Sequence, residues 1–185
     1  MDYEVIVIGS GPGGEGAAMR AVQAGKKVAM CDTFENIGGN CTHRGTIPSK
    51  ALRHATEILE NRDDFRNVNF TELLSTAETV IKSQMDLRKG FYTRNWVEIL
   101  DGVAAFVDKN TISVVHSSGE VKKYTSEYFI IATGSRPYHP ENIDFSHPRI
   151  VDSDTVLDLT GHPQSITIYG AGVIGCEYAS IFRGL

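Results

Sequence analysis

Two glycine-rich segments of this sequence repeat one pattern. Residues 9–14 read GSGPGG and directly follow the short apolar run Tyr3–Ile8. In a G-x-G-x-x-G turn between a strand and a helix, the first glycine permits the tight turn, the second lets backbone approach a pyrophosphate, and the third lets the helix pack close to the strand. The start of the helix offers unpaired N–H groups and a positive dipole end to phosphates. The residues predicted to bind a dinucleotide here are Gly9, Gly11, Pro12, Gly13 and Gly14.

An acidic residue follows the first glycine segment at a suitable distance. Asp32 comes directly after the second apolar run, Lys27–Cys31, and is followed by Thr33. Dinucleotide-binding units carry such an acid about 20 residues beyond the glycines, where its carboxylate accepts hydrogen bonds from the ribose. We therefore predict that Asp32 and Thr33 contact the adenosine end of a dinucleotide, with an ordinary glycine-rich turn as the alternative.

The second glycine segment predicts a second dinucleotide. Residues 170–175 read GAGVIG and follow the strand-like run 165–169. The acid that would choose between NAD and NADP is expected beyond Leu185, so this segment leaves the choice open. The residues predicted to contact this dinucleotide are Gly170, Gly172 and Gly175.

A third segment, residues 38–50 (GGNCTHRGTIPSK), resembles a known family. The class I pyridine nucleotide-disulfide oxidoreductases carry a G-G-x-C-x-x-x-x-C-I-P-S-K segment that lines the flavin, and residues 132–137 (ATGSRP) also match that family. The resemblance covers the whole chain. It implies FAD as cofactor, and a lysine near the flavin N5 that is paired with a glutamate. The residues to which it gives a role at the flavin are Gly38, Gly39, Asn40, Cys41, Thr46, Lys50, Thr133, Gly134 and Glu177.

The sequence departs from this family at Thr46, where the second cysteine of the family stands. A dithiol relay needs two sulfurs on Cα atoms roughly 4.4–6.8 Å apart. We therefore expect no redox disulfide, and residues 41–55 resemble a branch of the family that passes hydride between NAD(H) and NADP(H) through FAD. Cys41 is then a flavin contact or simply a small buried apolar residue. The Thr46 hydroxyl faces the flavin or bonds a nearby carbonyl.

Two other functions stay open. A disulfide or lipoamide reductase is disfavoured by Thr46. A catalytically inert FAD-binding fragment is the other, because most of a nicotinamide domain and the C-terminal interface domain of the family would follow residue 185. Without the resemblance, Lys50 is a solvated lysine in the first turn of a helix, and Glu177 is an acid that complements a helix dipole.

Composition excludes several classes of function. The net charge is −5 and no cluster of five Lys or Arg occurs, so a nucleic-acid partner is not expected. No apolar run approaches the roughly 18 residues of a membrane span, and no signal peptide is recognised. The three cysteines are an odd number and lie far apart, so they indicate neither a disulfide framework nor a metal site. We expect a cytoplasmic protein that forms a homo-oligomer at full length, as the family does.

The elements that must position these residues indicate an α/β fold. A Rossmann-like FAD domain with a parallel sheet and an antiparallel β-meander is predicted for residues 1–150, a linker for 151–164, and the first strand and helix of a Rossmann-like NAD(P) domain for 165–185. Helices are predicted at 15–24, 48–61 and 71–95, a loop at 33–45, a polar stretch at 62–69, and strands at 3–8, 27–31, 97–100, 104–107, 111–115, 122–124, 128–132 and 165–169.

Overall fold

The computed structural model describes residues 1–60, 70–161 and 163–184 and divides the chain into two compact units. Unit 1 consists of Met1–His43 with Gln84–Ser135. Unit 2 consists of Arg44–Ser83 with Arg136–Leu185. The boundary at Ser83 falls inside helix α4 (Phe70–Arg94), which contributes one part to each unit.

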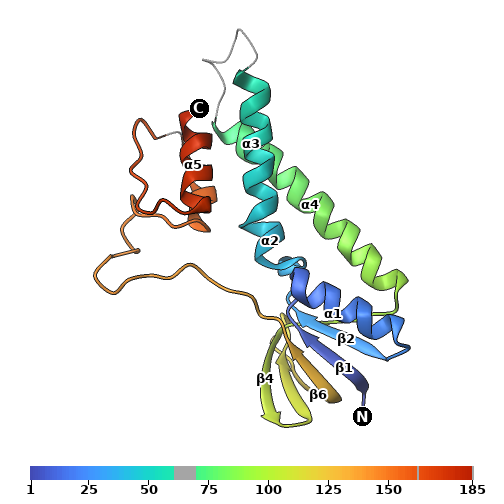
Figure 1. Ribbon diagram of the computed structural model, residues 1–185. Helices are drawn as coiled ribbons and strands as arrows, with labels where there is room; N and C mark the ends of the chain where they lie inside the picture. Colours follow the sequence, from blue (N-terminus) through green and yellow to red (C-terminus); the bar gives the residue numbers. More distant parts are fainter. Residues whose placement is uncertain (61–69, 162, 185) are drawn as a thin grey trace. The chain divides into compact units, whose positions relative to one another are not determined.

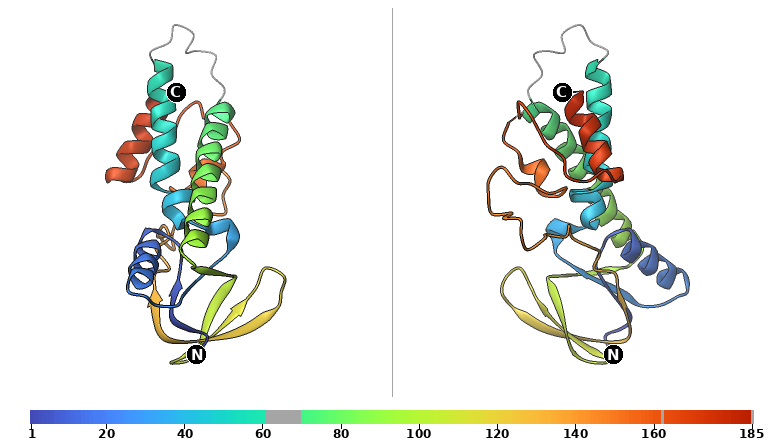
Figure 2. Two further views of the ribbon diagram at one scale, coloured as in Figure 1. Left: turned by 90° about the vertical axis from the view of Figure 1, so that its right-hand side faces the viewer. Right: turned by 60° about the vertical axis from the view of Figure 1, so that its left-hand side comes forward.

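Unit 1 is built on a six-stranded sheet with the order β3-β2-β1-β6-β5-β4 (Figure 1). β1 pairs in parallel with both β2 and β6, and β3 pairs in parallel with β2. β4, β5 and β6 form an antiparallel meander, seen as yellow-green to orange strands that fold back on one another in Figure 2. The strands are β1 (Tyr3–Ile8), β2 (Val28–Asp32), β3 (Glu98–Asp101), β4 (Val103–Asp108), β5 (Thr111–Val115) and β6 (Val121–Ile131).

Helix α1 (Pro12–Gln23) covers one face of the parallel strands. It begins with Pro12, whose missing N–H is not needed in the first turn. Ala18 is fully buried against β1 and β2, so the small residues of α1 let it approach the sheet closely. The helix ends where Gly25 takes a φ of +74° and Lys26 N–H donates to the Ala21 carbonyl. The predicted strand, glycine turn, helix and strand are therefore confirmed.

The meander differs from the prediction at β6. The predicted strands 122–124 and 128–132 are one continuous strand that changes partner near Ser126. Residues before Ser126 pair with β5, and residues from Ser126 onward pair with β1. Ser126 N–H donates to the Asn110 carbonyl, and Asn110 Nδ2 donates to the Ser126 carbonyl, so the backbone at the change of partner stays hydrogen-bonded. These tertiary contacts keep the polar residues between the two predicted runs extended.

The loop predicted for residues 33–45 also contains regular structure. It forms a short 3-10 helix, η1 (Phe34–Asn36), and a short helix, α2 (Gly39–His43). Thr42 Oγ1 donates to the Gly38 carbonyl at 3.1 Å, which closes the turn at the start of α2. The glycine and asparagine content that predicts a loop here instead supplies the positive φ of Gly38 and Gly39 that the entry into α2 needs.

Unit 2 packs helices around its own apolar cluster. α3 (Thr46–Glu60), the first part of α4, the 3-10 helix η3 (Thr155–Asp158) and α5 (Val173–Arg183) surround it. The buried residues of this cluster are Leu52, Ala77, Val156, Tyr178 and Ile181. Helices near 48–61 and 71–95 are confirmed over the described residues, while the predicted polar stretch 62–69 lies outside them.

The strand predicted for 165–169 is wrong. The segment pairs with no strand in the part of unit 2 that the structure describes. An apolar run becomes a strand only when a neighbour satisfies its backbone groups, and no such neighbour is placed beside it among these residues.

Candidate functional site

The first glycine turn joins β1 to α1 and admits only glycine at two positions. Gly9 has a φ of +104°, and a Cβ there would lie 2.3 Å from the Ala132 carbonyl oxygen. Gly14 is buried, and a Cβ there would lie 1.8 Å from the Gly9 carbonyl oxygen. The turn therefore brings the start of α1 tightly against the ends of β1 and β6.

The start of α1 is open in the way a phosphate site requires. Gly11 is the N-cap residue with extended backbone, and no side chain of the described residues caps the helix. Pro12 and Gly13 are exposed, and a Cβ on Gly13 would meet nothing within 4 Å. The N–H groups of Gly13 and Gly14 lie in the first turn, at the positive end of the helix dipole, and Gly13 itself is exposed. This arrangement fits the pyrophosphate of a dinucleotide.

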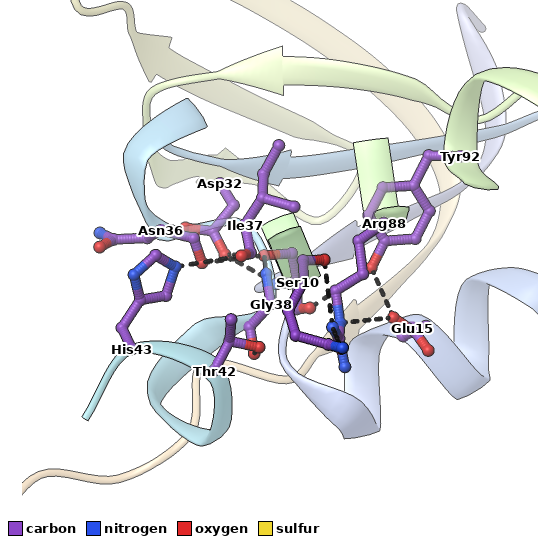
Figure 3. Close-up of polar contacts among 11 residues, drawn as sticks. Ser10, Glu15, Asp32, Asn36, Ile37, Gly38, Thr42, His43, Arg88 and Tyr92 are labelled. Atoms are coloured by element: carbon purple, nitrogen blue, oxygen red, sulfur yellow. Dashed lines mark hydrogen bonds and ion pairs between the residues drawn. The ribbon is translucent and has the colours of Figure 1, made fainter. Parts of the chain in front are cut away.

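Ser10 connects this turn to Asp32 and Gly38 (Figure 3). The buried Ser10 hydroxyl donates to Asp32 Oδ2 at 2.6 Å and accepts from Gly38 N–H at 3.0 Å. Asp32 Oδ2 also accepts from Ser10 N–H at 2.8 Å, and Asp32 Oδ1 accepts from Thr33 N–H at 2.9 Å. The carboxylate has about four acceptor positions, so it retains capacity for a ribose hydroxyl. Sequence reasoning missed Ser10, although a serine inside the glycine motif with an acid after the next strand was a readable signal.

The loop at Gly38 and Gly39 packs directly on the phosphate-binding turn. Gly39 has a φ of +60°, and a Cβ there would lie 2.8 Å from Gly11 Cα. A Cβ on Gly38 would lie 2.3 Å from Thr42 Oγ1. The absence of side chains at both positions lets backbone approach backbone, so the two predicted segments form one surface.

The end of β6 completes this surface. Asn40 Nδ2 donates to the Ser135 carbonyl at 3.2 Å, directly after Gly134, whose φ is +74°. Thr133 Cα lies 3.2 Å from the position of a Gly9 Cβ. The structure therefore brings the residues predicted in unit 1 to the carboxyl ends of β1, β2 and β6. Ligands of open α/β sheets bind at that edge.

The cysteines have different surroundings, and all three are free. Cys41 is half-buried within α2, and Cys176 is exposed on α5. Burial, with Asp32 as the next contribution, raises the pKa of Cys31 to about 12, and its Sγ lies 3.6 Å from the Gly102 carbonyl oxygen. Cys31 is thus an inert core residue.

Unit 2 brings Lys50 and Glu177 together. The Lys50 ammonium forms an ion pair with Glu177 Oε1, and the hydroxyl of buried Ser49 lies 3.2 Å from Oε2. The Lys50 side chain is 62% exposed and the Glu177 side chain 18% exposed. The Lys50 ammonium of α3 is therefore at the surface, and it is paired with the largely buried Glu177 carboxylate of α5. Thr46 is the exposed first residue of α3.

A second contact joins the same two helices. Arg53 Nη1 donates to Ser180 Oγ, one turn further along both α3 and α5. Burial, followed by the charge of Glu177, raises the pKa of Tyr178 to about 12, so this phenol remains protonated at neutral pH. Sequence reasoning missed Ser49, Arg53 and Ser180, because their contacts are set by how α5 lies on α3.

The second glycine turn has the same local form as the first. Gly170 has a φ of +133°, Gly172 is the extended N-cap of α5, and a Cβ on Gly175 would lie 2.1 Å from the Gly170 carbonyl oxygen. The start of α5 is exposed at Val173 and Ile174. It offers uncapped N–H groups in the same way as α1.

Two kinds of site are not found among the described residues. They contain no group of three or more His, Cys, Asp or Glu side chains that could hold a metal ion. No helix in them combines the length and apolar character needed to cross a membrane.

The fold and this arrangement define a class of protein. The family described as pyridine nucleotide-disulphide oxidoreductase matches residues 3–185, and the chain belongs to that family. The structure is similar to a copper(II) complex of the HOCl-induced flavoprotein disulfide reductase RclA from Escherichia coli. The TM-score is 0.85 and the identity 26%, over 100% of this chain and 40% of that one.

The curated proteins that are similar in sequence share a more specific name. The chain is 54% identical to a soluble pyridine nucleotide transhydrogenase of Enterobacter sp. (strain 638), over 100% of this chain and 41% of that protein. It is also 54% identical to the soluble pyridine nucleotide transhydrogenase of Azotobacter vinelandii (strain DJ), over 100% of this chain and 42% of that protein. The chain thus spans about two fifths of the length of these relatives.

Proposed function

We propose that this chain is the FAD-binding part of a transhydrogenase that passes hydride between NAD(H) and NADP(H). The observation that carries the proposal is the junction of β1, β2, β6 and the Gly38–Gly39 loop around the open start of α1. The names of the relatives and the family match support the choice of reaction. When bound, FAD would supply a ring that accepts and returns a hydride.

The residues of unit 1 would bind and orient the cofactor. The N–H groups of Gly13 and Gly14 would bind the pyrophosphate, and Asp32 with Thr33 the adenosine ribose. Gly11 and Gly39 would let the dinucleotide approach the backbone. The residues of unit 1 that we propose along the flavin are Gly38, Asn40, Cys41, Thr133 and Gly134.

Lys50 and Glu177 would act on charge at the flavin. A lysine ammonium beside the ring stabilises negative charge that develops there, and the carboxylate fixes the position of the ammonium. The ion pair and the Ser49 contact support these roles. Thr46 and the three free cysteines support a reaction without a redox disulfide.

The second glycine turn would bind the nicotinamide dinucleotides. Gly170, Gly172 and Gly175 shape the exposed start of α5, and both NAD(H) and NADP(H) carry the pyrophosphate that such a turn accepts. The proposal assigns 1–150 to FAD, 151–164 to a linker and 165–185 to the nicotinamide domain of a homo-oligomeric protein.

The test is a two-nucleotide assay on full-length protein purified with FAD. We expect NADPH to reduce a thio analogue of NAD⁺ when no other acceptor is present. A parallel assay offers NADPH or NADH with lipoamide and with oxidised glutathione, where we expect no turnover above that of free FAD. Disulfide turnover without transhydrogenation would replace the proposal by the disulfide reductase alternative, which the similarity to RclA represents. If the purified protein binds no FAD, both the transhydrogenase and the disulfide reductase are excluded.

A further inference from the structure

The N-terminal end of α1, where we propose that phosphates bind, carries an acidic side chain. Glu15 lies in the first turn of that helix, one residue after Gly14. A carboxylate near a helix start stabilises the isolated helix, but it also repels a second anion bound at the same place. A pyrophosphate at Gly13 and Gly14 would therefore bind beside a like charge unless Glu15 were neutralised.

Arg88 of α4 supplies the opposite charge. Its Nε lies 3.2 Å from Glu15 Oε2, and the side chains of Arg88 and Glu15 are 17% and 31% exposed. Arg88 Nη1 donates to Gln84, at 3.2 Å to the carbonyl and at 2.8 Å to Oε1. The guanidinium is thus held from its own helix and presented to the carboxylate. Partial burial makes this pair stronger than an exposed one.

The Arg88–Glu15 pair lies beside both the glycine turn at Ser10 and the loop at Gly38 (Figure 3). The Tyr92 hydroxyl lies 3.2 Å from Glu15 Oε2 and 3.4 Å from the Ser10 carbonyl oxygen. Burial, followed by the charge of Glu15, raises the pKa of Tyr92 well above its usual range, so the hydroxyl stays a donor. Arg88 Cδ lies 3.2 Å from the position of a Gly38 Cβ, which places the arginine against the Gly38 backbone.

We infer that Arg88 is a positioning residue for the FAD pyrophosphate, which it serves by holding and neutralising Glu15. The inference rests on the proposed FAD site and extends it to α4, which carries no cofactor motif. Arg88 acts through Glu15, so the effect of removing Arg88 depends on whether the carboxylate is still there. A merely structural ion pair predicts instead that loss of either partner alone weakens FAD binding, because either loss would harm the turn.

The test measures the dissociation constant of FAD, by quenching of flavin fluorescence, on full-length apoprotein. We expect Arg88→Met to weaken binding about tenfold, since it leaves a partly buried carboxylate unpaired beside the phosphates. Glu15→Gln is expected to bind FAD as tightly as wild type or more tightly. The double variant should recover to within about threefold of wild type. Arg88→Lys, which keeps the charge, should bind better than Arg88→Met.

Ionic strength and a matched variant separate the charge effect from general damage. At 1 M salt, where the Debye length is about 3 Å, the loss in Arg88→Met should shrink. Lys82→Met removes an exposed charge of the same helix and should leave FAD binding unchanged. Equal weakening by Arg88→Met and Glu15→Gln, or unchanged binding in Arg88→Met, would overturn the role of Arg88. If Arg88→Met does not fold, weaker binding in Glu15→Gln alone would overturn it. Wild-type protein that takes up no FAD would overturn the proposed function as well.

Discussion

The two glycine turns of this chain share a local geometry and differ in what surrounds them. In each, the first glycine has a positive φ, the second is an extended N-cap, and the third stands against the carbonyl of the first. The first turn follows a strand in which Ile6 and Val7 are fully buried. The second follows residues 165–169, which pair with no strand among the described residues and in which Tyr169 is 98% exposed.

The contacts beyond each motif show the same contrast. A Cβ on Gly9 would meet the backbone of β6 at 2.3 Å, whereas a Cβ on Gly170 would meet nothing within 4 Å. Ser10 bonds Asp32 and Gly38, whereas the corresponding Ala171 is exposed and has no hydroxyl. The motif therefore determines the turn, and the sheet determines how closely the turn is packed.

The largest expected effect is that of an alanine at the first glycine. Both Gly9→Ala and Gly170→Ala place a Cβ on a positive-φ residue, which costs about 1–3 kcal/mol. Gly9→Ala also forces β1 away from β6, which adds roughly 1–3 kcal/mol of overpacking. Urea unfolding followed by circular dichroism should show the larger loss for Gly9→Ala. Equal losses in the free energy of unfolding would mean that packing against β6 adds nothing to the cost of Gly9→Ala.

A smaller effect is expected at the second position of each motif. Ser10→Ala leaves the Gly38 N–H without its acceptor and removes one donor to Asp32, which should lower the free energy of unfolding by about 1–3 kcal/mol. Ala171→Ser adds a hydroxyl at an exposed position and should change it by less than about 0.5 kcal/mol. The same denaturation experiment measures both variants, and a stable Ser10→Ala would show that the network is not needed.

The loss of the Lys50–Glu177 ion pair of unit 2 is expected to affect stability less than the loss of the Ser10 hydroxyl. Lys50→Met removes an ion pair whose cation is mostly exposed, so the free energy of unfolding should fall by at most about 1 kcal/mol. We nevertheless expect FAD to stay bound while its reduction by NADPH, followed by stopped-flow absorbance, becomes slower. Lys82→Met is the control for loss of an exposed lysine. An unchanged reduction rate in Lys50→Met would remove Lys50 from the mechanism.

Local patterns predicted most of the site residues in unit 1. The glycine spacing and Asp32 were sufficient because a tight turn and a helix start depend on neighbours in sequence. The pairing of Lys50 with Glu177 came from the family resemblance, and the structure has that ion pair. Ser10, Arg88 and Tyr92 were missed because their partners come from other elements.

The sequence by itself determined the glycine turns, the α1 and α5 helices, and β1 to β5, since each follows from backbone freedom and apolar periodicity over short distances. Only the tertiary structure decided that β6 is one strand with two partners, that residues 165–169 pair with no strand among the described residues, and that Arg88 meets Glu15. The reason is that a strand or a charge pair needs a partner, and the partner is brought to it by the packing of elements far apart in the chain.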